Sequence, residues 1–328
     1  MPLHAETRRV LQLMEERGAP PLDSLPPDEA RAARRALAPP VTEPCHETVA
    51  IDAGGVPARL YRPDPSAMAT TPPGLLVFFH GGGWVIGDLE SHDNVCHALC
   101  RRSGHVVLSV DYRLAPEHPF PAGLDDARRT TVWAHDHADE LGIDPRRLAI
   151  GGDSAGANLA AVVGYEQPVP VRFQLLVYPV TDARMITDSY EENAEGYFLT
   201  ASSMRWFVDH YLGGAEGSPT DPRVSPLLAP DDVLASSPPT MVITAGYDPL
   251  RDEGVSFAER LGTLGVATSH VHYPGQIHGF FSLGHLVSDA RGAAALAAQA
   301  LLDALAPDSP RVEARQPGTI ARRTDARR

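Results

Sequence analysis

A serine flanked by two glycines is the residue of this sequence best placed to act as a nucleophile. Ser154 stands in the pattern Gly152-Asp153-Ser154-Ala155-Gly156, directly after the apolar run 148–150 and directly before a helical pattern. On such a strand–turn–helix corner a serine is held above the sheet, and the glycines avoid clashes across the turn. The pattern predicts a nucleophile elbow, with an ordinary glycine-rich turn as the alternative.

A serine hydroxyl is a weak nucleophile unless a base takes its proton and a carboxylate orients that base. We expect His278 and Asp248 in these two roles, because each follows the end of a predicted strand, as Ser154 does. Their order along the chain, serine, aspartate and then histidine, is the order expected of an α/β-hydrolase. Asp252 is a rival orienting residue, although we expect it to cap the next helix, and His285 is a rival base in a less constrained segment.

Three successive glycines follow a second apolar run. The run 75–79 shows no alternation, which suits a strand buried on both faces, and it ends at His80-Gly81-Gly82-Gly83-Trp84. Unshielded backbone N–H groups in such a loop can point at one spot, and a developing oxyanion is their natural occupant. The alternative is a flexible glycine loop.

Eight predicted strands would bring these pieces together. A β-hairpin covers 46–62, with its turn at 52–55. Six further strands are expected at 75–79, 105–110, 147–152, 173–180, 241–246 and 268–273. Helices are expected at 91–102, 122–141, 155–163, 253–264 and 288–306. The loops at the carboxyl ends of parallel strands meet at one edge. The fold class is therefore α/β, with a mostly parallel eight-stranded sheet flanked by helices.

Two regions interrupt the strand–helix alternation. Residues 3–37 read as helical segments broken by prolines, and residues 185–212 as an aromatic-rich helical insertion. Each region either packs on the domain or lies at its surface without a functional role, or it forms one half of a helical cap over a substrate cleft. Four aromatic residues are candidates for an apolar pocket wall: Trp84, Tyr197, Phe198 and Phe207. We divide the chain into an N-terminal cap segment, 1–40, a catalytic domain, 41–306, with a cap insertion at about 185–215, and a disordered arginine-rich tail, 307–328.

Composition narrows the class of protein. The chain has 328 residues, of which 43% are hydrophobic, and a formal net charge of -14 that argues against nucleic-acid binding. No apolar run reaches the roughly 18 residues of a membrane helix, and the N-terminus has no apolar signal core. The cysteines are few and odd in number, which indicates reduced thiols in a cytoplasmic protein. They are Cys45, Cys96 and Cys100.

We expect neither a metal nor an organic cofactor. Two histidines and two cysteines, His92, Cys96, His97 and Cys100, fall in one predicted helix, but their spacing matches no common zinc pattern. A Walker loop and a dinucleotide-binding glycine pattern are both missing from the sequence. His270 and His272 share one face of a predicted strand and are expected to be structural.

Together, five motifs resemble those of the bacterial hormone-sensitive-lipase-like (family IV) carboxylesterases of the α/β-hydrolase superfamily. The motifs occupy residues 80–84, 111–117, 152–156, 248–252 and 278–280. The resemblance implies Ser154 as the nucleophile, His278 as the base and Asp248 as the orienting residue. It also implies an oxyanion hole made by the backbone N–H groups of Gly82, Gly83 and Ala155.

The resemblance further implies hydrolysis of short- to medium-chain carboxylic esters through an acyl-enzyme. Lactonase, deacetylase or amidase activity would use the same residues. A non-catalytic small-molecule-binding relative, or a dehydratase or lyase, is disfavoured by the intact set of Ser154, Asp248 and His278. Dimerisation through the last strand, near 268–273, is another expectation. The helix after the elbow is expected to be short, because the segment between residues 161 and 173 is about one helical turn shorter than is usual for the family.

Overall fold

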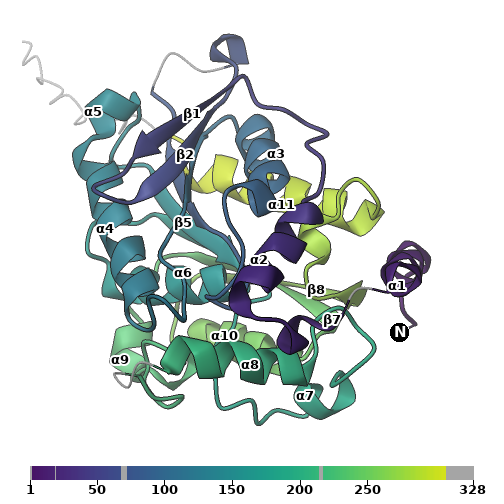
Figure 1. Cartoon of the computed structure of the whole chain (residues 1–328). Helices are drawn as coiled ribbons and strands as arrows, with labels where there is room; N and C mark the ends of the chain where they lie inside the picture. Colours follow the sequence, from purple (N-terminus) through teal and green to yellow (C-terminus); the bar gives the residue numbers. More distant parts are fainter. Residues whose placement is uncertain (1, 19, 68–71, 214–216, 308–328) are drawn as a thin grey trace, which may run out of the picture.

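The molecule is built around one twisted sheet with helices on both faces (Figure 1). The structure is a computed structural model, and it describes residues 2–18, 20–67, 72–213 and 217–307. The eight strands lie in the spatial order β1-β2-β4-β3-β5-β6-β7-β8. Their bounds are β1 (Glu47–Asp52), β2 (Pro57–Arg62), β3 (Leu75–Phe79), β4 (Val106–Val110), β5 (Leu148–Asp153), β6 (Phe173–Val177), β7 (Thr240–Tyr247) and β8 (Thr268–Ile277).

The sheet is parallel except at one edge. β1 pairs with β2, and β2 with β4, in antiparallel register, whereas every pair from β4 to β8 is parallel. Phe79 at the end of β3 pairs with Gly152 at the end of β5, so the glycine loop and the serine turn leave the sheet side by side. The predicted eight-stranded, mostly parallel α/β-hydrolase fold is confirmed.

Burial explains why the central strands lack alternation. Every residue of β3, β4, β5 and β6 is buried, because helices cover both faces of the sheet. α3 (Asp93–Ser103) and α11 (Ser288–Ala304) lie together on one face, and α4 (Ala122–Asp136), α6 (Ala155–Glu166) and α10 (Arg251–Thr263) lie on the other (Figure 1).

Two predicted helices differ from the observed ones. The stretch expected as one helix from 122 to 141 is divided at His137 into α4 and the short α5 (Ala138–Leu141). The elbow helix α6 runs to Glu166, three residues beyond its predicted end, and is buried almost throughout. Its length reflects packing between β5, β6 and α4, which the local sequence pattern does not report.

The two regions outside the alternation are helical and meet each other. The N-terminal region holds α1 (Ala5–Arg17), the 3-10 turn η1 (Leu22–Ser24) and α2 (Pro27–Ala36). The insertion after β6 holds α7 (Ser189–Glu192) and α8 (Ala201–Leu212), and a short α9 (Asp231–Leu234) precedes β7. η1 packs against α8, and α2 packs against the turn η3 (Glu90–His92), which follows the glycine loop. The predicted disordered tail falls, beyond residue 307, outside the described residues.

Candidate active site

Ser154 occupies a strained corner between β5 and α6. Its φ of 55° is positive, a conformation that costs energy in a residue other than glycine. A Cβ added to Gly156 would lie 1.9 Å from the carbonyl oxygen of Phe79, and one added to Gly152 would lie 2.4 Å from the same oxygen. The two glycines of the motif are therefore required by the neighbouring strand β3, and the serine leaves the sheet at the sharp turn that the sequence predicts.

Ser154 begins a hydrogen-bonded chain of three side chains. Nε2 of His278 lies 2.9 Å from the serine Oγ, and Nδ1 of the same ring lies 2.8 Å from Oδ2 of Asp248. Asp248 is completely buried, and its second oxygen accepts the backbone N–H of Leu250 at 2.9 Å. The three residues follow β5, β8 and β7, so the carboxyl edge of the sheet brings together residues up to 124 positions apart in the chain.

The rival residues lie in other networks. Asp252 accepts the backbone N–H of Ser189 at 2.9 Å and pairs with Arg251, so it neither reaches His278 nor caps α10, whose N-cap is Leu250. The expectation that Asp252 caps the helix is wrong, because Ser189 of the insertion after β6 binds its carboxylate. His285 takes no part in the hydrogen-bonded chain of Ser154.

His270 and His272 both bond to the hydroxyl of Thr244 on the neighbouring strand β7, at 2.8 and 2.9 Å. They stabilise the pairing of β7 and β8, as the sequence predicts for two histidines on one strand face.

Three backbone N–H groups in the glycine loop and at the start of α6 have no hydrogen-bond partner among the described residues. Gly82 and Gly83 have φ of 125° and 58°, conformations that side chains rarely adopt. Ala155 is the first residue of α6, so its N–H is one of the unpaired donors of a helix N-terminus. Within the part of the chain that the structure describes, no hydrogen bond involves the N–H of Gly82, Gly83 or Ala155. The donors are thus free to bind an oxygen atom that carries negative charge.

Asp153 holds the glycine loop against the elbow. Its Oδ1 accepts the backbone N–H of Gly81 at 2.8 Å and lies 3.1 Å from Nε2 of His92. Burial raises the pKa of this carboxyl, but the His92 charge and the hydrogen bonds outweigh burial and hold the pKa below its usual value. Sequence analysis missed this positioning role, although a carboxylate inside the elbow motif was a visible signal.

His80, the first residue of the glycine loop, is fixed by contacts with Tyr112. Its ring stacks on Tyr112 with centroids 4.4 Å apart, and the Tyr112 hydroxyl donates to the His80 carbonyl at 2.8 Å. Complete burial lowers the pKa of His80 to about 4, so the ring is neutral at physiological pH. Tyr112 belongs to the motif at 111–117, which therefore braces the glycine loop.

Two further residues near the serine gave no signal in the sequence. The ring of Tyr178, just after β6, lies 4.4 Å from that of His278 and limits its rotation. Arg34 lies on α2, and burial lowers the pKa of its guanidinium, while electrostatic interactions with Asp153 and Tyr178 partly oppose that shift. The Arg34 guanidinium forms neither a hydrogen bond nor an ion pair with the described residues, whereas the Arg34 backbone carbonyl accepts the N–H of Leu37 at 3.1 Å. The N-terminal region thus places a positive charge beside the elbow.

The four aromatic candidates for a pocket wall divide into two pairs. Phe207 lies where a Cβ of Gly83 would be, 2.1 Å from that position, and Phe198 lies 2.9 Å from the corresponding position of Gly279, the residue after His278. These two rings border the site. Trp84 is buried and stacks on Tyr211 of α8 at 4.2 Å, and Tyr197 packs on Tyr247 at 4.8 Å. Trp84 thus joins the insertion to the glycine loop, and Tyr197 joins it to β7.

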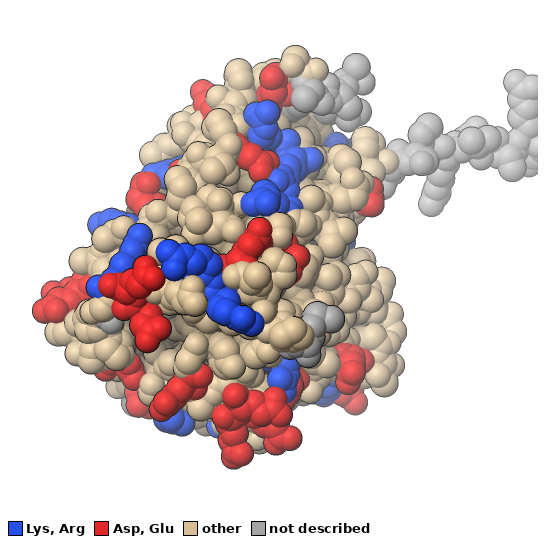
Figure 2. Space-filling model, turned by 90° about the vertical axis from the view of Figure 1, so that its right-hand side faces the viewer, with Lys and Arg blue, Asp and Glu red and all other residues tan. Residues whose placement is uncertain are grey.

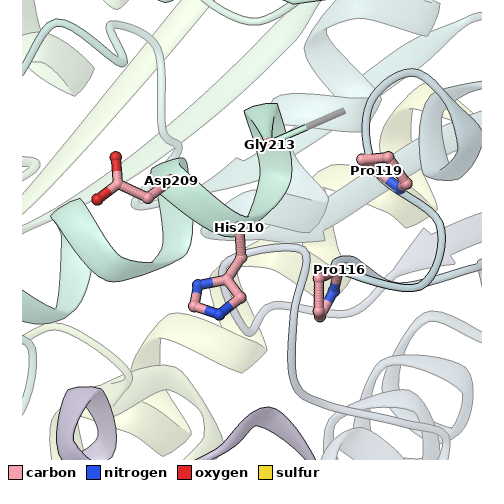
Figure 3. Close-up of a pocket in the computed structure, with 5 residues that line it drawn as sticks. All are labelled: Pro116, Pro119, Asp209, His210 and Gly213. Carbon is pink, nitrogen blue, oxygen red and sulfur yellow. The ribbon is translucent and has the colours of Figure 1, made fainter. Parts of the chain in front are cut away.

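Two cavities open on the insertion. One, of about 460 Å³, is bordered by Phe198 and lies between η1 and the start of α8. The other, of about 330 Å³, lies between the loop 116–119 and the end of α8, with Pro116 and His210 among the residues that line it (Figure 3). Only the first shares a residue with the surroundings of Ser154.

No group of three or more His, Cys, Asp or Glu side chains in the described ranges could hold a metal ion. None of the helices in that part of the chain is both long and apolar enough to cross a bilayer. On the face drawn in Figure 2, acidic and basic side chains are interspersed, without an extended basic surface.

Comparison with known proteins places the chain in a family. A family model for the alpha/beta hydrolase fold matches residues 76–282. The chain therefore belongs to this family, in its hormone-sensitive-lipase-like branch, as the motifs predicted.

Curated relatives are ester hydrolases. Carboxylic ester hydrolase LipN of Mycobacterium tuberculosis is 48% identical over 244 residues, which are 71% of this chain and 63% of that protein. The chain thus matches less than two thirds of LipN. Ethyl acetate hydrolase of Pseudomonas putida is 36% identical over 320 residues, which cover 92% of this chain and 99% of the relative.

Solved structures agree with the fold. The ester-hydrolase EH1AB1 from the metagenome of Lake Arreo, solved with a bipyridine phosphonate derivative, superposes with a TM-score of 0.86 and 42% identity, covering 92% of this chain and 98% of that one. A thermostable esterase from Pseudomonas putida ECU1011 gives a TM-score of 0.85 and 36% identity, with 93% and 98% covered.

Proposed function

We propose that this chain is a serine carboxylesterase in which Ser154 is the nucleophile, His278 the general base and Asp248 the residue that orients the histidine. The observation that carries the proposal is the unbroken hydrogen-bonded chain of these side chains, at 2.9 and 2.8 Å, beside three unpaired backbone N–H groups. The curated relatives are ester hydrolases, which supports the same class of reaction.

In the acylation step the serine Oγ attacks the ester carbonyl carbon while Nε2 of His278 takes the hydroxyl proton. Asp248 accepts a hydrogen bond from Nδ1–H, remains ionised and stabilises the imidazolium that forms. The carbonyl oxygen becomes negatively charged and is bound by the N–H groups of Gly82, Gly83 and Ala155. When the tetrahedral intermediate collapses, His278 returns its proton to the leaving alcohol, and the acyl group stays on Ser154.

Deacylation repeats these roles with water as the nucleophile. His278 takes a proton from the water as it attacks the acyl-enzyme, and the same three N–H groups bind the second oxyanion. The proton then passes to the serine Oγ, which releases the carboxylic acid. Each oxyanion donor typically contributes about 10²–10³ in rate. The sequence of steps requires no group beyond the side chains and backbone of this chain.

We propose that α2 and α8, with the segments next to them, form a cap over the site, as the domain division into 1–40, 41–306 and the insertion at about 185–215 implies. Phe207 and Phe198 make the inner wall apolar, and the cavity of about 460 Å³ beside Phe198 is the proposed entrance for the ester. Such a space suits acyl chains of short to medium length. A relative acts on ethyl acetate, and another is named an arylesterase, from Saccharolobus solfataricus.

The test of the function is the hydrolysis of p-nitrophenyl esters from acetate to laurate by the full chain and its Ser154→Ala variant. We expect activity to be greatest for the shorter chains and to fall by roughly 10⁴–10⁶ in the variant. Ser109→Ala, at a second fully buried serine, is the control and should stay active. Wild-type turnover by Ser154→Ala would overturn the proposal.

Labelling by a fluorophosphonate separates the alternatives. If Ser154 is labelled but no ester is cleaved, the residues are competent and the substrate is a lactone, an amide or an acetylated metabolite. If the folded protein is not labelled, the chain is a small-molecule-binding relative without catalytic activity.

We further propose that two copies pair through β8. This strand is the edge of the sheet, and side chains in its first half, including Ser269 and His270, are exposed. A monomer mass by light scattering would exclude the pairing. The three free cysteines support a reducing, cytoplasmic environment, which localisation of a tagged chain would test.

A further inference from the structure

A cysteine far from Ser154 faces a histidine and a carboxylate. Sγ of Cys45, in the segment before β1, lies 3.1 Å from Nδ1 of His97, and Nε2 of that ring lies 3.5 Å from Oδ2 of Asp93. His97 and Asp93 are four residues apart on α3, so they share one face of the helix. The order thiol, imidazole, carboxylate is the arrangement that activates cysteine nucleophiles.

The hydrogen bonds define how the histidine is protonated. The backbone N–H of Cys45 donates to Nδ1 of His97 at 3.0 Å, so Nδ1 is an acceptor and the ring proton lies on Nε2, toward Asp93. Asp93 also accepts the hydroxyl of Tyr61 and the guanidinium of Arg59, each at 2.7 Å. The Tyr61 ring meets that of His97 edge-on, with centroids 5.0 Å apart. The imidazole is therefore held with its acceptor nitrogen beside the thiol, and the thiol itself donates to the backbone carbonyl of Glu47 at 3.2 Å.

A second cysteine lies behind the first. Cys100 lies three residues beyond His97 on α3, so it shares the helix face against which Cys45 packs. The nearby Cys100, together with His97, lowers the pKa of Cys45 to about 6, and the nearby Cys45 and burial raise the pKa of Cys100. Cys45 is half-buried, whereas Cys100 is fully buried. One thiol is thus accessible and ionised readily, and the other is protected and stays protonated, as in pairs of attacking and resolving cysteines.

We propose that Cys45 and Cys100 form a dithiol–disulfide site that reacts with small acidic disulfides. The Cys45 thiolate attacks one sulfur of the external disulfide, whose S–S bond breaks and releases one thiol. Cys100 loses its proton and attacks Sγ of Cys45 in the mixed disulfide, which releases the second thiol and forms the Cys45–Cys100 bond. Two protein thiols are oxidised and one external disulfide is reduced to two thiols.

The surroundings favour an acidic partner. The exposed Arg101 donates to the carbonyl of Pro44, the residue before Cys45, at 3.1 Å, and Arg102 next to it pairs with Glu43. No carboxylate of the described residues forms an ion pair with Arg101. Its positive charge therefore stays available beside the thiol. A disulfide that carries carboxylates, such as glutathione disulfide, matches that charge.

The test is the reaction of the reduced full chain with glutathione disulfide, followed by mass spectrometry of peptides. We expect a Cys45–Cys100 cross-link and no adduct on Cys96, which is also buried on α3 but has no place in the pair. Cys100→Ser should stop at a glutathione adduct on Cys45, and Cys96→Ser should behave as the wild type. Failure of Cys100→Ser to accumulate that adduct, or a cross-link that includes Cys96, would refute the proposal.

A pH profile tests the activation of Cys45 without relying on a fold-sensitive variant. At pH 6.5 the native protein should react on the order of fivefold faster than free cysteine, because its larger thiolate fraction outweighs its weaker intrinsic nucleophilicity. The rate should level off near neutrality, whereas that of free cysteine keeps rising to pH 8.5. His97→Asn should shift the profile toward that of cysteine. A wild-type profile identical to that of cysteine would contradict the site. Ser154→Ala should oxidise normally, so the outcome is independent of the esterase proposal.

Discussion

At the scale of single residues, reactivity here comes from partners that lie far away in the chain. Ser154 has no acceptor for its proton within its own turn, and His278 supplies one only because β8 ends beside β5. Asp248 and Asp252 are both aspartates at the start of one helix. Only Asp248 faces His278, while the carboxylate of Asp252 is bound by Ser189 and Arg251.

The two aspartates therefore make a matched pair of variants. We expect Asp248→Asn to lower kcat by about 10⁴, because an amide that donates to Nδ1 holds the wrong tautomer of the histidine. Asp252→Asn should keep kcat within a few-fold. The measurement is steady-state hydrolysis of p-nitrophenyl acetate, with thermal unfolding to show that both variants fold. Equal losses in the two variants would assign the orienting role to neither.

Gly83 gives a second prediction at this scale. Gly83→Ala places a Cβ against the Phe207 ring at a φ of 58°, so the loop must shift and kcat should fall by about 10² or more. Gly104→Ala is the control, since its φ is 67° but nothing lies within 4 Å of its Cβ position. It should cost about 1 kcal/mol of stability and leave kcat unchanged. If Gly83→Ala retains full activity, its N–H is not an oxyanion donor.

At the scale of elements, the N-terminal helix α2 is clamped onto the loop that carries the glycines. Nε of Arg31 donates to the carbonyl of Val85 and Nη2 to that of Ala115, both at 2.8 Å, and the guanidinium also binds Glu117 through two bonds. Val85 in turn donates its N–H to the Gly82 carbonyl at 3.1 Å. One side chain therefore links α2 to the glycine loop and to the motif at 111–117.

We expect Arg31→Ala to weaken this link by about 1.5–3 kcal/mol, the usual contribution of hydrogen bonds to a charged group. Because the loop would lose its outer support, kcat/KM should fall about tenfold. Arg9→Ala, which removes an exposed ion pair with Glu16 on α1, should change stability by less than about 1 kcal/mol. Denaturant unfolding and ester hydrolysis measure the two effects. Identical behaviour of the two variants would mean that α2 does not support the loop.

At the scale of the whole molecule, burial of neutral histidines makes the fold sensitive to acid. Burial lowers the pKa of His80 and of His105 to about 4, and His105 accepts the backbone N–H of Gly74 at 3.1 Å. The unfolded chain binds these protons near pH 6.5, whereas the folded chain binds them only near pH 4. The contribution of these two neutral histidines to the free energy of unfolding is therefore fully present above pH 6.5. It is lost as the pH falls from 6.5 to 4.

Each histidine should contribute about 3 kcal/mol to that loss, at roughly 1.4 kcal/mol for each unit of pKa difference. His105→Asn keeps an acceptor for the Gly74 N–H but does not titrate, so it should remove that share of the pH dependence. Urea unfolding at pH 7 and pH 4.5 measures the difference. A variant whose stability falls as steeply as that of the wild type would show that His105 is not neutral in the folded state.

Much of this protein could be predicted from its sequence, because some features depend on local chemistry alone. Continuous apolar runs at 75–79 and 148–150 indicated strands buried on both faces. The glycine pattern around Ser154 predicted a sharp turn, and the order of serine, aspartate and histidine indicated the family before any contact was known. Local patterns also predicted the hairpin at 46–62, whose turn requires glycines.

Tertiary structure decided which side chains meet. Asp153 at the end of β5, Arg34 on α2 and Cys45 before β1 meet partners that strand order and helix packing bring close. No periodicity within a segment encodes such pairings, since they depend on how separate elements are stacked. The sequence determined which residues were able to react and which elements hold them. The register of the sheet and the docking of α2, α3 and α8 determined the distances, the burial and the charges under which they react.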